Sequence, residues 1–429
     1  MKIERKRWLF GATAALTGAA LALGASLPAA ANPVGAPTYR ALAGVGSDTT
    51  QDVMNGISAV VTDSNGTLVV GSYDATGTPT ITPKPNRTFA RPDGSGDGVT
   101  ALKAAKNSAA YKGTILQPTD LQFARSSSAA STWNSQGAYA YIPLALDAVS
   151  FATAPASTKV PNDIPLGASK DELNSDGSLK LTLKNIYTRN ATSTLKDSTT
   201  GTTYTVGDQA SGADIVPFKP QPGSGTLSFW TAQMGGTLGS IVSDTFTYST
   251  TEAECATNPA TPTIDHTPAL PAWDALTGKC TAGVQEHNGK ATAEVSNAVI
   301  PFSIAQYLAQ SNAGTLAATY GVTVTDRRNS AVLGKVDGVN TTTGTPAVLN
   351  TSFPIRRVVF NVVAVADLND ALIQQVFVGS GADAYTALNP QTQNRLVIED
   401  FGFGDITGGV TVPGDPNTYT AGDTNHRAV

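Results

Sequence analysis

Three glycine- and serine-containing turns each precede a predicted helix and could bind an anion. The first covers residues 44–51, Gly-Val-Gly-Ser-Asp-Thr-Thr-Gln, and the others cover 93–96 and 222–226. Glycine permits a tight turn, and Ser, Asp and Thr are favoured helix caps. The free N–H groups and the positive dipole end of a helix N-terminus can hold a small anion. Each turn taken singly could be an ordinary cap, but the recurrence favours oxyanion binding as a hypothesis.

Charged side chains near these turns are the next candidates. Arg125 follows a predicted buried strand and precedes three serines, so a planar guanidinium and hydroxyl donors could share one oxyanion. The alternative for Arg125 is a salt bridge to an Asp at the domain edge. Arg91 and Lys219 precede the second and third turns and are weaker candidates. Asp48 could accept a hydrogen bond from a protonated oxyanion, or it could cap the helix.

Motifs for catalysis and for metal binding are absent from the sequence. It contains no Gly-x-Ser-x-Gly, no His-Glu-x-x-His and no phosphate loop ending in Gly-Lys-Ser/Thr. The histidines, His266, His287 and His426, lack metal-site spacing. We therefore expect a protein that is not an enzyme and that has no cofactor and no metal.

The first 31 residues have the pattern of a secretion signal, with a basic end, an apolar run at 9–27 and the small residues Ala29–Ala31. No Cys lies at the cleavage site for a lipid anchor, and no later run is long enough to cross a bilayer. We expect a secreted protein, extracellular or associated with the cell envelope. Cleavage removes four basic residues and one acidic residue, so the net charge moves from −5 to −8. This acidity argues against nucleic-acid binding.

Cys255 and Cys280 are the two cysteines of the chain, and they flank a segment rich in Pro and Thr. In an exported protein such a pair predicts one disulfide that closes a loop.

Hydrophobic patterns predict strands that alternate with helices in the first third, which indicates parallel pairing with ligands beyond the carboxyl ends of the strands. The expected strands are 39–45, 68–73, 121–124, 141–153 and 358–365, and the expected helices are 52–61, 99–110, 302–309 and 367–378. Residues 74–98 read as a long loop, and the tail after Gly408 reads as loose. The run 141–153 should cross between two lobes, and the chain should cross back near 298–303.

The order of these pieces resembles the phosphate-binding proteins of bacterial ABC importers, a branch of the type 2 periplasmic-binding-protein fold. The landmarks are Gly44–Thr50, Gln122–Ser127, the Gly-Ser-Gly-Thr of 223–226 and the Phe-Pro-Ile of 353–355. The resemblance implies an α/β protein with mixed sheets, flanking helices and a cleft between two lobes. Lobe 1 would contain 32–145 and 301–429, and lobe 2 would contain 146–300 with an insertion at 244–290.

Carried over by position, the resemblance implies a ligand site. The ligand-binding residues that we predict are Ser47, Asp48, Thr49, Arg125, Ser126, Ser127, Ser224, Gly225 and Thr226, with Arg91, Ser95 and Lys219 as weaker candidates. The family's Arg of the third turn falls on Pro220, beside Lys219, and its proton-accepting Asp falls on Ser127. That acceptor separates protonated phosphate from sulfate. Arg125 could supply the missing cation, and Asp48 could supply the missing acceptor.

The function that follows is capture of a small oxyanion, inorganic phosphate first, by a monomeric binding protein with an ABC permease as its candidate partner. The alternative is a non-transport interaction module on the same fold with an altered or lost anion site. Its working surfaces would be the insertions 74–98 and 244–290. A secreted phosphoester hydrolase is a third, less favoured hypothesis.

Overall fold

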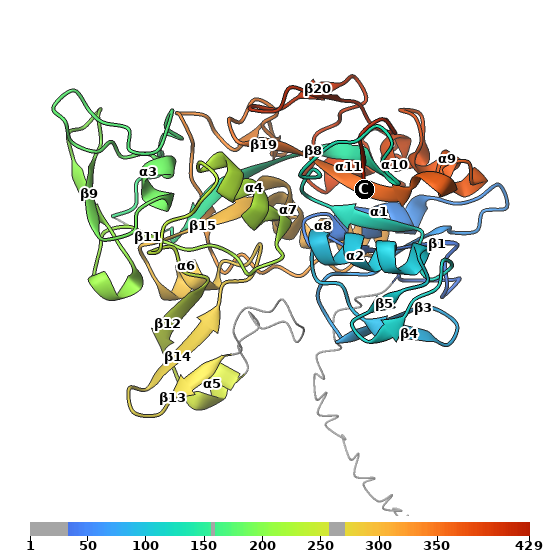
Figure 1. The fold of residues 1–429 in the computed structure, drawn as a ribbon, viewed down its shortest axis with the longest axis horizontal. Helices are drawn as coiled ribbons and strands as arrows, with labels where there is room; N and C mark the ends of the chain where they lie inside the picture. The colour runs from blue at the N-terminus through green and yellow to red at the C-terminus, as the bar shows by residue number, and fades with distance from the viewer. Residues whose placement is uncertain (1–32, 156–158, 257–270) are drawn as a thin grey trace, which may run out of the picture.

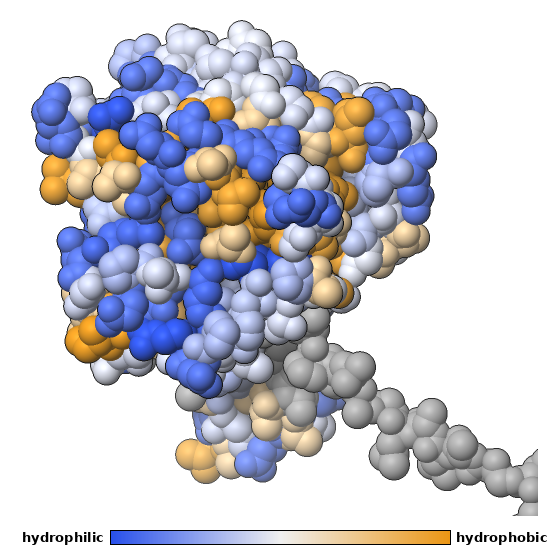
Figure 2. Space-filling view, turned by 90° about the vertical axis from the view of Figure 1, so that its right-hand side faces the viewer, coloured by the Kyte–Doolittle hydropathy of each residue, from blue (hydrophilic) through white to orange (hydrophobic). Residues whose placement is uncertain are grey.

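The computed structural model describes residues 33–155, 159–256 and 271–429. The chain is an α/β protein in which helices flank a mixed sheet, as the sequence predicted (Figure 1). The expected signal peptide, residues 1–31, lies outside the described residues. Within the described ranges, no helix has the length and apolar character needed to cross a membrane. Figure 2 shows one face on which hydrophilic residues surround separate hydrophobic patches.

The largest sheet in the described part of the chain has nine strands. Its order is β11 (Val216–Pro217), β15 (Ala298–Ser303), β8 (Tyr139–Thr153), β19 (Arg356–Ala364), β7 (Phe123–Ser126), β1 (Leu42–Gly46) and β2 (Val70–Ser72), and β16 (Val332–Leu333) and β22 (Arg427–Ala428) also pair with β8. Strand β1 is parallel to β2 and β7, whereas β19 is antiparallel to β7 and β8. The parallel pairing expected in the first third is therefore present, within a mixed sheet.

Helices lie toward both ends of this sheet (Figure 1). Near β1 and β2 are α1 (Gln51–Val60), α2 (Ser95–Lys106), α8 (Ala313–Tyr320), α9 (Ala371–Phe377), α10 (Asp383–Thr386) and α11 (Val397–Asp400). Toward β11 are α3 (Leu183–Tyr187), α4 (Gly225–Gln233) and α6 (Lys290–Glu294), with α7 (Ile304–Ser311) between the two groups. Two short 3₁₀ helices, η1 (Gln209–Ser211) and η2 (Val365–Asp367), are also present.

Small sheets extend from this frame. They are formed by β3 (Thr80–Lys84) with β4 (Arg87–Ala90), β5 (Ala110–Tyr111) with β6 (Thr114–Ile115), β9 (Ser193–Lys196) with β10 (Thr203–Val206), β17 (Thr342–Thr343) with β18 (Val348–Leu349), β20 (Val410–Thr411) with β21 (Thr418–Tyr419), and β12 (Thr245–Ser249) with β14 (Lys279–Gly283) and β13 (Ala272–Asp274). The last sheet projects from the body with α5 (Glu252–Ala256), as Figure 1 shows. The predicted disulfide Cys255–Cys280 joins α5 to β14.

Two segments expected to be irregular are ordered. Residues 74–98 contain the β3–β4 hairpin, and α2 begins at Ser95, four residues before the expected start. Alternating burial in β3 places Ile81 inside, a signal that the surrounding Thr and Pro concealed. The tail after Gly408 forms β20 and β21, and its end pairs with β8 through β22. The expected helix 367–378 starts only at Ala371, because the Asp370 carboxylate caps it there.

Strand β8 connects the two ends of the large sheet, and all fifteen of its residues are buried. Neighbouring strands β15 and β19 cover its two edges, so its near-continuous apolar sequence is that of an interior strand. The register with β19 shifts between Val359 and Phe360, where Phe360 pairs with Pro143. Proline has no N–H to donate, which is why the ladder is irregular at this point.

Close contact between α2 and the end of β1 depends on glycine. A Cβ at Gly98 would lie 2.4 Å from the Gly46 Cα and 3.0 Å from the Val45 carbonyl oxygen. Gly46 itself has a φ of +119°, a conformation that favours glycine. The first turn is therefore held directly against the helix that carries the second.

We predict that Gly98→Ala destabilises the protein by about 1–3 kcal/mol, because backbone atoms that cannot move aside meet the new methyl group. Gly96→Ala is the matched control on the same helix, since Gly96 is exposed and a Cβ there meets nothing within 4 Å. The control should be neutral or stabilising by up to about 1 kcal/mol. Denaturant unfolding of both variants measures the difference, and equal effects would contradict the close approach.

Candidate functional site

The turn between β1 and α1 is buried. Ser47, Asp48, Thr49 and Thr50 are each at most 1% exposed. The hydroxyls of Ser47 and Thr50 have no hydrogen-bond partner within the described chain. The Asp48 carboxylate accepts from the Arg327 guanidinium at 3.0 and 3.2 Å. This turn therefore carries buried donors that the described chain does not use.

The Arg125 guanidinium holds the backbone of the first turn by donating to its carbonyl oxygens. Its Nε donates to the Ser47 carbonyl at 3.2 Å, its Nη2 to the Gly46 carbonyl at 3.1 Å and its Nη1 to the Ser72 hydroxyl at 2.9 Å. Burial lowers the pKa of Arg125 to about 10, against the opposing effect of nearby carboxylates such as Asp74. The guanidinium binds backbone oxygens of the turn, and in this arrangement its role is to hold the turn in place.

The second turn meets the third through small side chains. The Ser95 hydroxyl accepts from the Ser127 amide at 3.0 Å and lies 3.2 Å from the Ser127 hydroxyl. A Cβ at Gly225 would come within 2.2 Å of the Ser127 Oγ and 2.6 Å of the Ser95 Oγ. The Ser224 hydroxyl caps α4 by accepting from the Leu227 amide at 3.0 Å. The hydroxyl of Ser126 donates to the carbonyl of Ser128 at 2.7 Å, within its own loop.

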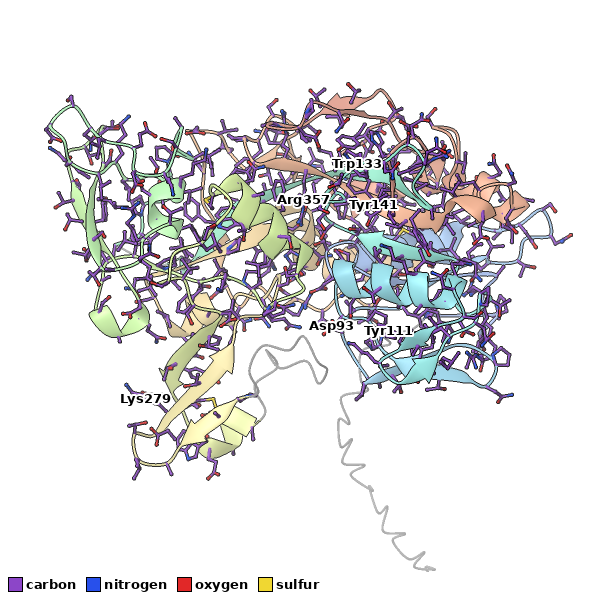
Figure 3. The ribbon with its side chains drawn as sticks, in the orientation of Figure 1. Asp93, Tyr111, Trp133, Tyr141, Lys279 and Arg357 are labelled. Carbon is purple, nitrogen blue, oxygen red and sulfur yellow. A yellow bond between two sulfur atoms is a disulfide. The ribbon has the colours of Figure 1, made fainter. Side chains whose placement is uncertain are left out.

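Arg357 joins the first turn to the third. Its Nη2 donates to the Thr226 hydroxyl at 2.8 Å and to the Thr49 hydroxyl at 3.2 Å. Asp147 of β8 pairs with the same guanidinium at 2.9 Å. The residue is 3% exposed, and Nη1 has no partner within the described chain. Figure 3 labels Arg357 near the middle of the molecule, between the helices of the two ends.

The three turns thus converge on a place formed by Thr49, Thr226, Arg357 and Glu286, which we call the meeting point of the turns. The acidic side chain at this point is Glu286. Its Oε1 accepts from the Thr226 amide at 3.1 Å, at the N-terminus of α4, and from the Thr49 hydroxyl at 3.3 Å. The Nε2 of His287 lies 3.2 Å from the same oxygen. Because the His287 Nδ1 accepts from the Ser303 amide at 3.3 Å, Nε2 is the ring nitrogen that carries the proton.

Electrostatics around Glu286 favour its charged form. Burial alone would raise the pKa of this carboxyl, but His287, the Thr226 amide and Arg357 outweigh it and hold the pKa well below its ordinary value. A fully buried carboxylate is itself an oxyanion. The site therefore stabilises one negative carboxylate oxygen through the Thr226 amide and the Thr49 hydroxyl, with His287 and Arg357 close by.

The remaining predicted residues lie outside this meeting point. Arg91 donates to the Thr78 carbonyl at 2.6 Å and to the Asp74 carbonyl at 2.7 Å, in the segment after β2. Lys219 is half-buried beside β11, and its amide donates to the Ser243 carbonyl at 2.9 Å.

The site residues Arg357, Glu286 and His287 were not among the sequence candidates. The sequence signal that could have indicated Arg357 was the pair of adjacent arginines in the apolar run 355–363.

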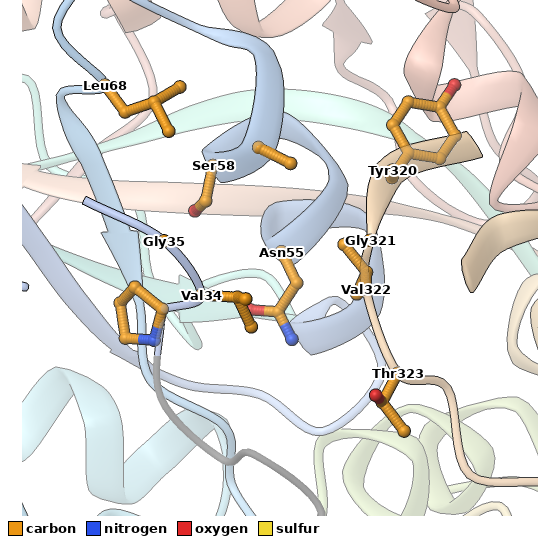
Figure 4. Close-up of a pocket in the computed structure, with 11 residues that line it drawn as sticks. Val34, Gly35, Asn55, Ser58, Leu68, Tyr320, Gly321, Val322 and Thr323 are labelled. Atoms are coloured by element: carbon orange, nitrogen blue, oxygen red, sulfur yellow. The ribbon is translucent and has the colours of Figure 1, made fainter. Parts of the chain in front are cut away.

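Of two cavities in the described chain, the larger is lined by residues of the site and the smaller is not. One of about 760 Å³ includes Ser127 and Arg357 in its lining. Another of about 220 Å³ lies between residues 33–35, α1 and residues 320–323 (Figure 4), and its lining contains no charged side chain. An anion would find a cation only in the larger of these two. In the described ranges, no three His, Cys, Asp or Glu side chains gather as metal ligands.

Comparisons with known proteins give structural neighbours only. No family model and no curated protein matches the sequence. A protein of Clostridium perfringens assigned to phosphate ABC transport, solved with bound phosphate, is 14% identical, with a TM-score of 0.39 over 77% of this chain and 88% of that one. A phosphate transport receptor of Vibrio cholerae is 11% identical, with a TM-score of 0.36 over 78% of this chain and 90% of that one. PstS of Borrelia burgdorferi is 13% identical, with a TM-score of 0.36 over 85% of this chain and 98% of that one. At these TM-scores the likenesses carry no argument about function.

We predict that Arg125→Ala destabilises the protein by about 3 kcal/mol or more, because it leaves the buried Ser47 and Gly46 carbonyls without their donor and removes a positive charge that offsets the Asp74 carboxylate. Lys159→Ala is the control, since Lys159 forms an ion pair with Asp214 in which both side chains are at least partly exposed to solvent, and its loss should change the stability little. Chemical denaturation compares them. An Arg125 variant as stable as the control would contradict the supporting role.

Behind the first turn, burial raises the pKa of Asp52 to about 7, with Asp74 and Asp48 adding to the effect and Arg327 opposing it. The folded chain therefore binds the proton of the Asp52 carboxyl more tightly than the unfolded chain does. The contribution of this proton to the free energy of unfolding is lost as the pH rises from about 4 to about 7. We predict that Asp52→Asn is more stable than the parent by about 2–4 kcal/mol at pH 8 and equal to it near pH 4. Parallel stability curves across this pH range would refute the assignment.

Proposed function

We propose that the protein is a secreted solute-binding protein that captures a small oxyanion, inorganic phosphate first, for import by an ABC permease. The observation that carries the proposal is the convergence of three turns on one stabilised buried negative charge. Helix N-termini and hydroxyls replace the hydration shell of an anion, and closure of the two predicted lobes excludes solvent. In this proposal residues 1–31 are a cleaved signal, the mature chain is a monomer, and the lobes have the boundaries given above.

The ligand donors in this proposal are the Ser47 hydroxyl, the Thr49 and Thr226 groups, and Arg357, with Ser127 and Ser95 beside them. Arg357 supplies the cation that the sequence interpretation assigned to Arg125. Glu286 supplies the acceptor that it assigned to Asp48, whose carboxylate pairs with Arg327. Phosphate at neutral pH keeps a proton that a carboxylate can accept, whereas sulfate has none. An ionised Glu286 therefore favours phosphate over sulfate.

One observation favours a second candidate, an interaction module that no longer binds an anion. The Glu286 carboxylate already accepts from the α4 N-terminus, and Ser95, Ser127 and Gly225 are in direct contact. In this candidate Glu286 is a permanent internal substitute for the ligand. The two candidates make opposite predictions for Glu286→Gln.

We predict that phosphate raises the melting temperature of the purified chain and that Ser47→Ala weakens phosphate binding about tenfold without lowering the melting temperature of the free protein. The Ser47 hydroxyl has no partner, so its removal costs little stability. Thr153→Val is the matched control, because the Thr153 hydroxyl is also buried without a partner but lies on β8. Calorimetry with phosphate and sulfate measures both variants. No heat and no thermal shift with either anion would eliminate oxyanion capture.

Glu286→Gln separates the two candidates. If Glu286 is the proton acceptor, the variant binds phosphate more weakly and loses the preference for phosphate over sulfate. If Glu286 is an internal substitute, the variant binds both anions more tightly than the parent, because a competing charge is gone. Titration of both anions at pH 7.5 gives the answer, and tighter binding of both would overturn the acceptor role.

A further inference from the structure

The cavity of about 760 Å³ lies against the meeting point of the turns. Its lining comes from four places: the loop that carries Ser127 and Trp133, the α4 face with Phe229, the β19 residues Arg357 and Phe360, and the β20–β21 segment with Tyr419. Cavities of roughly 300–1,000 Å³ are the size that encloses organic ligands. The space is therefore large for a bare tetrahedral anion.

Aromatic rings form much of this lining. Trp133 contacts Phe360 edge-on, with ring centroids 6.3 Å apart, and Phe360 contacts Tyr419 at 5.6 Å. Phe360 and Tyr419 are buried, whereas Trp133 and Phe229 are half-buried. Figure 3 labels Trp133 and Arg357 in the same upper central region of the molecule. The half-buried rings keep surface that a planar group can contact.

A cation lies at the same cavity. The Arg357 Cζ is 5.4 Å from the centre of the Phe229 ring, and Arg357 lines the cavity. Its Nη2 is used by Thr226, Thr49 and Asp147, but Nη1 is buried without a partner in the described chain. A buried unpaired guanidinium N–H is costly unless a ligand accepts from it. One lining thus combines the Arg357 side chain with aromatic surface, together with the Asp415 carboxylate, which accepts from the Tyr419 hydroxyl.

We propose that this cavity binds a small organic anion in which a phosphate or carboxylate group is attached to a planar ring. The anionic group accepts from the Arg357 Nη1, and the ring lies between Trp133 and Phe229. The inference rests on the proposed function in one respect, that Arg357 recognises an anion. It differs in the ligand, because the ring adds contacts that inorganic phosphate lacks.

The test is calorimetric titration of the full chain with phenyl phosphate and with inorganic phosphate. We expect phenyl phosphate to bind about tenfold more tightly. Trp133→Ala should abolish this preference and leave the affinity for inorganic phosphate unchanged. Trp273→Ala is the matched control, since Trp273 lies on β13 of the projecting sheet and should change neither affinity.

Each outcome bears on a different claim. Equal affinities of the two ligands in the parent, or a Trp133 variant that loses both ligands equally, would overturn the aromatic site and leave oxyanion capture standing. Binding of phenyl phosphate without binding of inorganic phosphate would support the aromatic site and overturn capture of the bare anion. Binding of neither ligand would overturn both.

Discussion

The site depends on the buried ion pair between Arg357 and Asp147. Both side chains are at most 3% exposed, and they lie on β19 and β8, the two long strands of the sheet. A buried charge is tolerated when it is paired and hydrogen-bonded. With Asp147 fixing one side of the guanidinium, its Nη2 reaches Thr49 and Thr226, so two turns that are far apart in sequence meet. Loss of this pair would separate the turns and leave a charge unpaired.

Glu286 completes the charge balance at this point. The helix end at Thr226 and Arg357 form a positive environment, to which the His287 Nε2–H adds a donor, and the carboxylate neutralises part of it. The same environment would attract an external anion, so the internal carboxylate and a ligand act on one set of donors. Whether they cooperate through a shared proton or compete depends on the protonation of the ligand. The aromatic cavity has Arg357 in its lining, so an anion can approach the guanidinium from that side.

Local sequence patterns predicted the α/β class, the three turns and the disulfide, because caps, glycines and cysteine spacing act over short distances. They did not predict the β3–β4 hairpin or the ordered tail, whose stability comes from pairing and packing rather than from propensity. They also did not indicate Arg357, Glu286 or His287. These residues lie within β19 and in the segment after β14, and only the tertiary fold brings them to the turns. The ligand-binding roles of the predicted residues stay predictions.

The most direct measurement is a crystal structure of the protein grown with arsenate, with anomalous data collected at the arsenic absorption edge. Oxyanion capture predicts an arsenic peak whose oxygens lie within hydrogen-bonding distance of the Thr226 amide and the Arg357 guanidinium. It also predicts that the Glu286 carboxylate has moved to face the anion. No arsenic peak near these groups, with Glu286 still bonded to the Thr226 amide, would contradict the account.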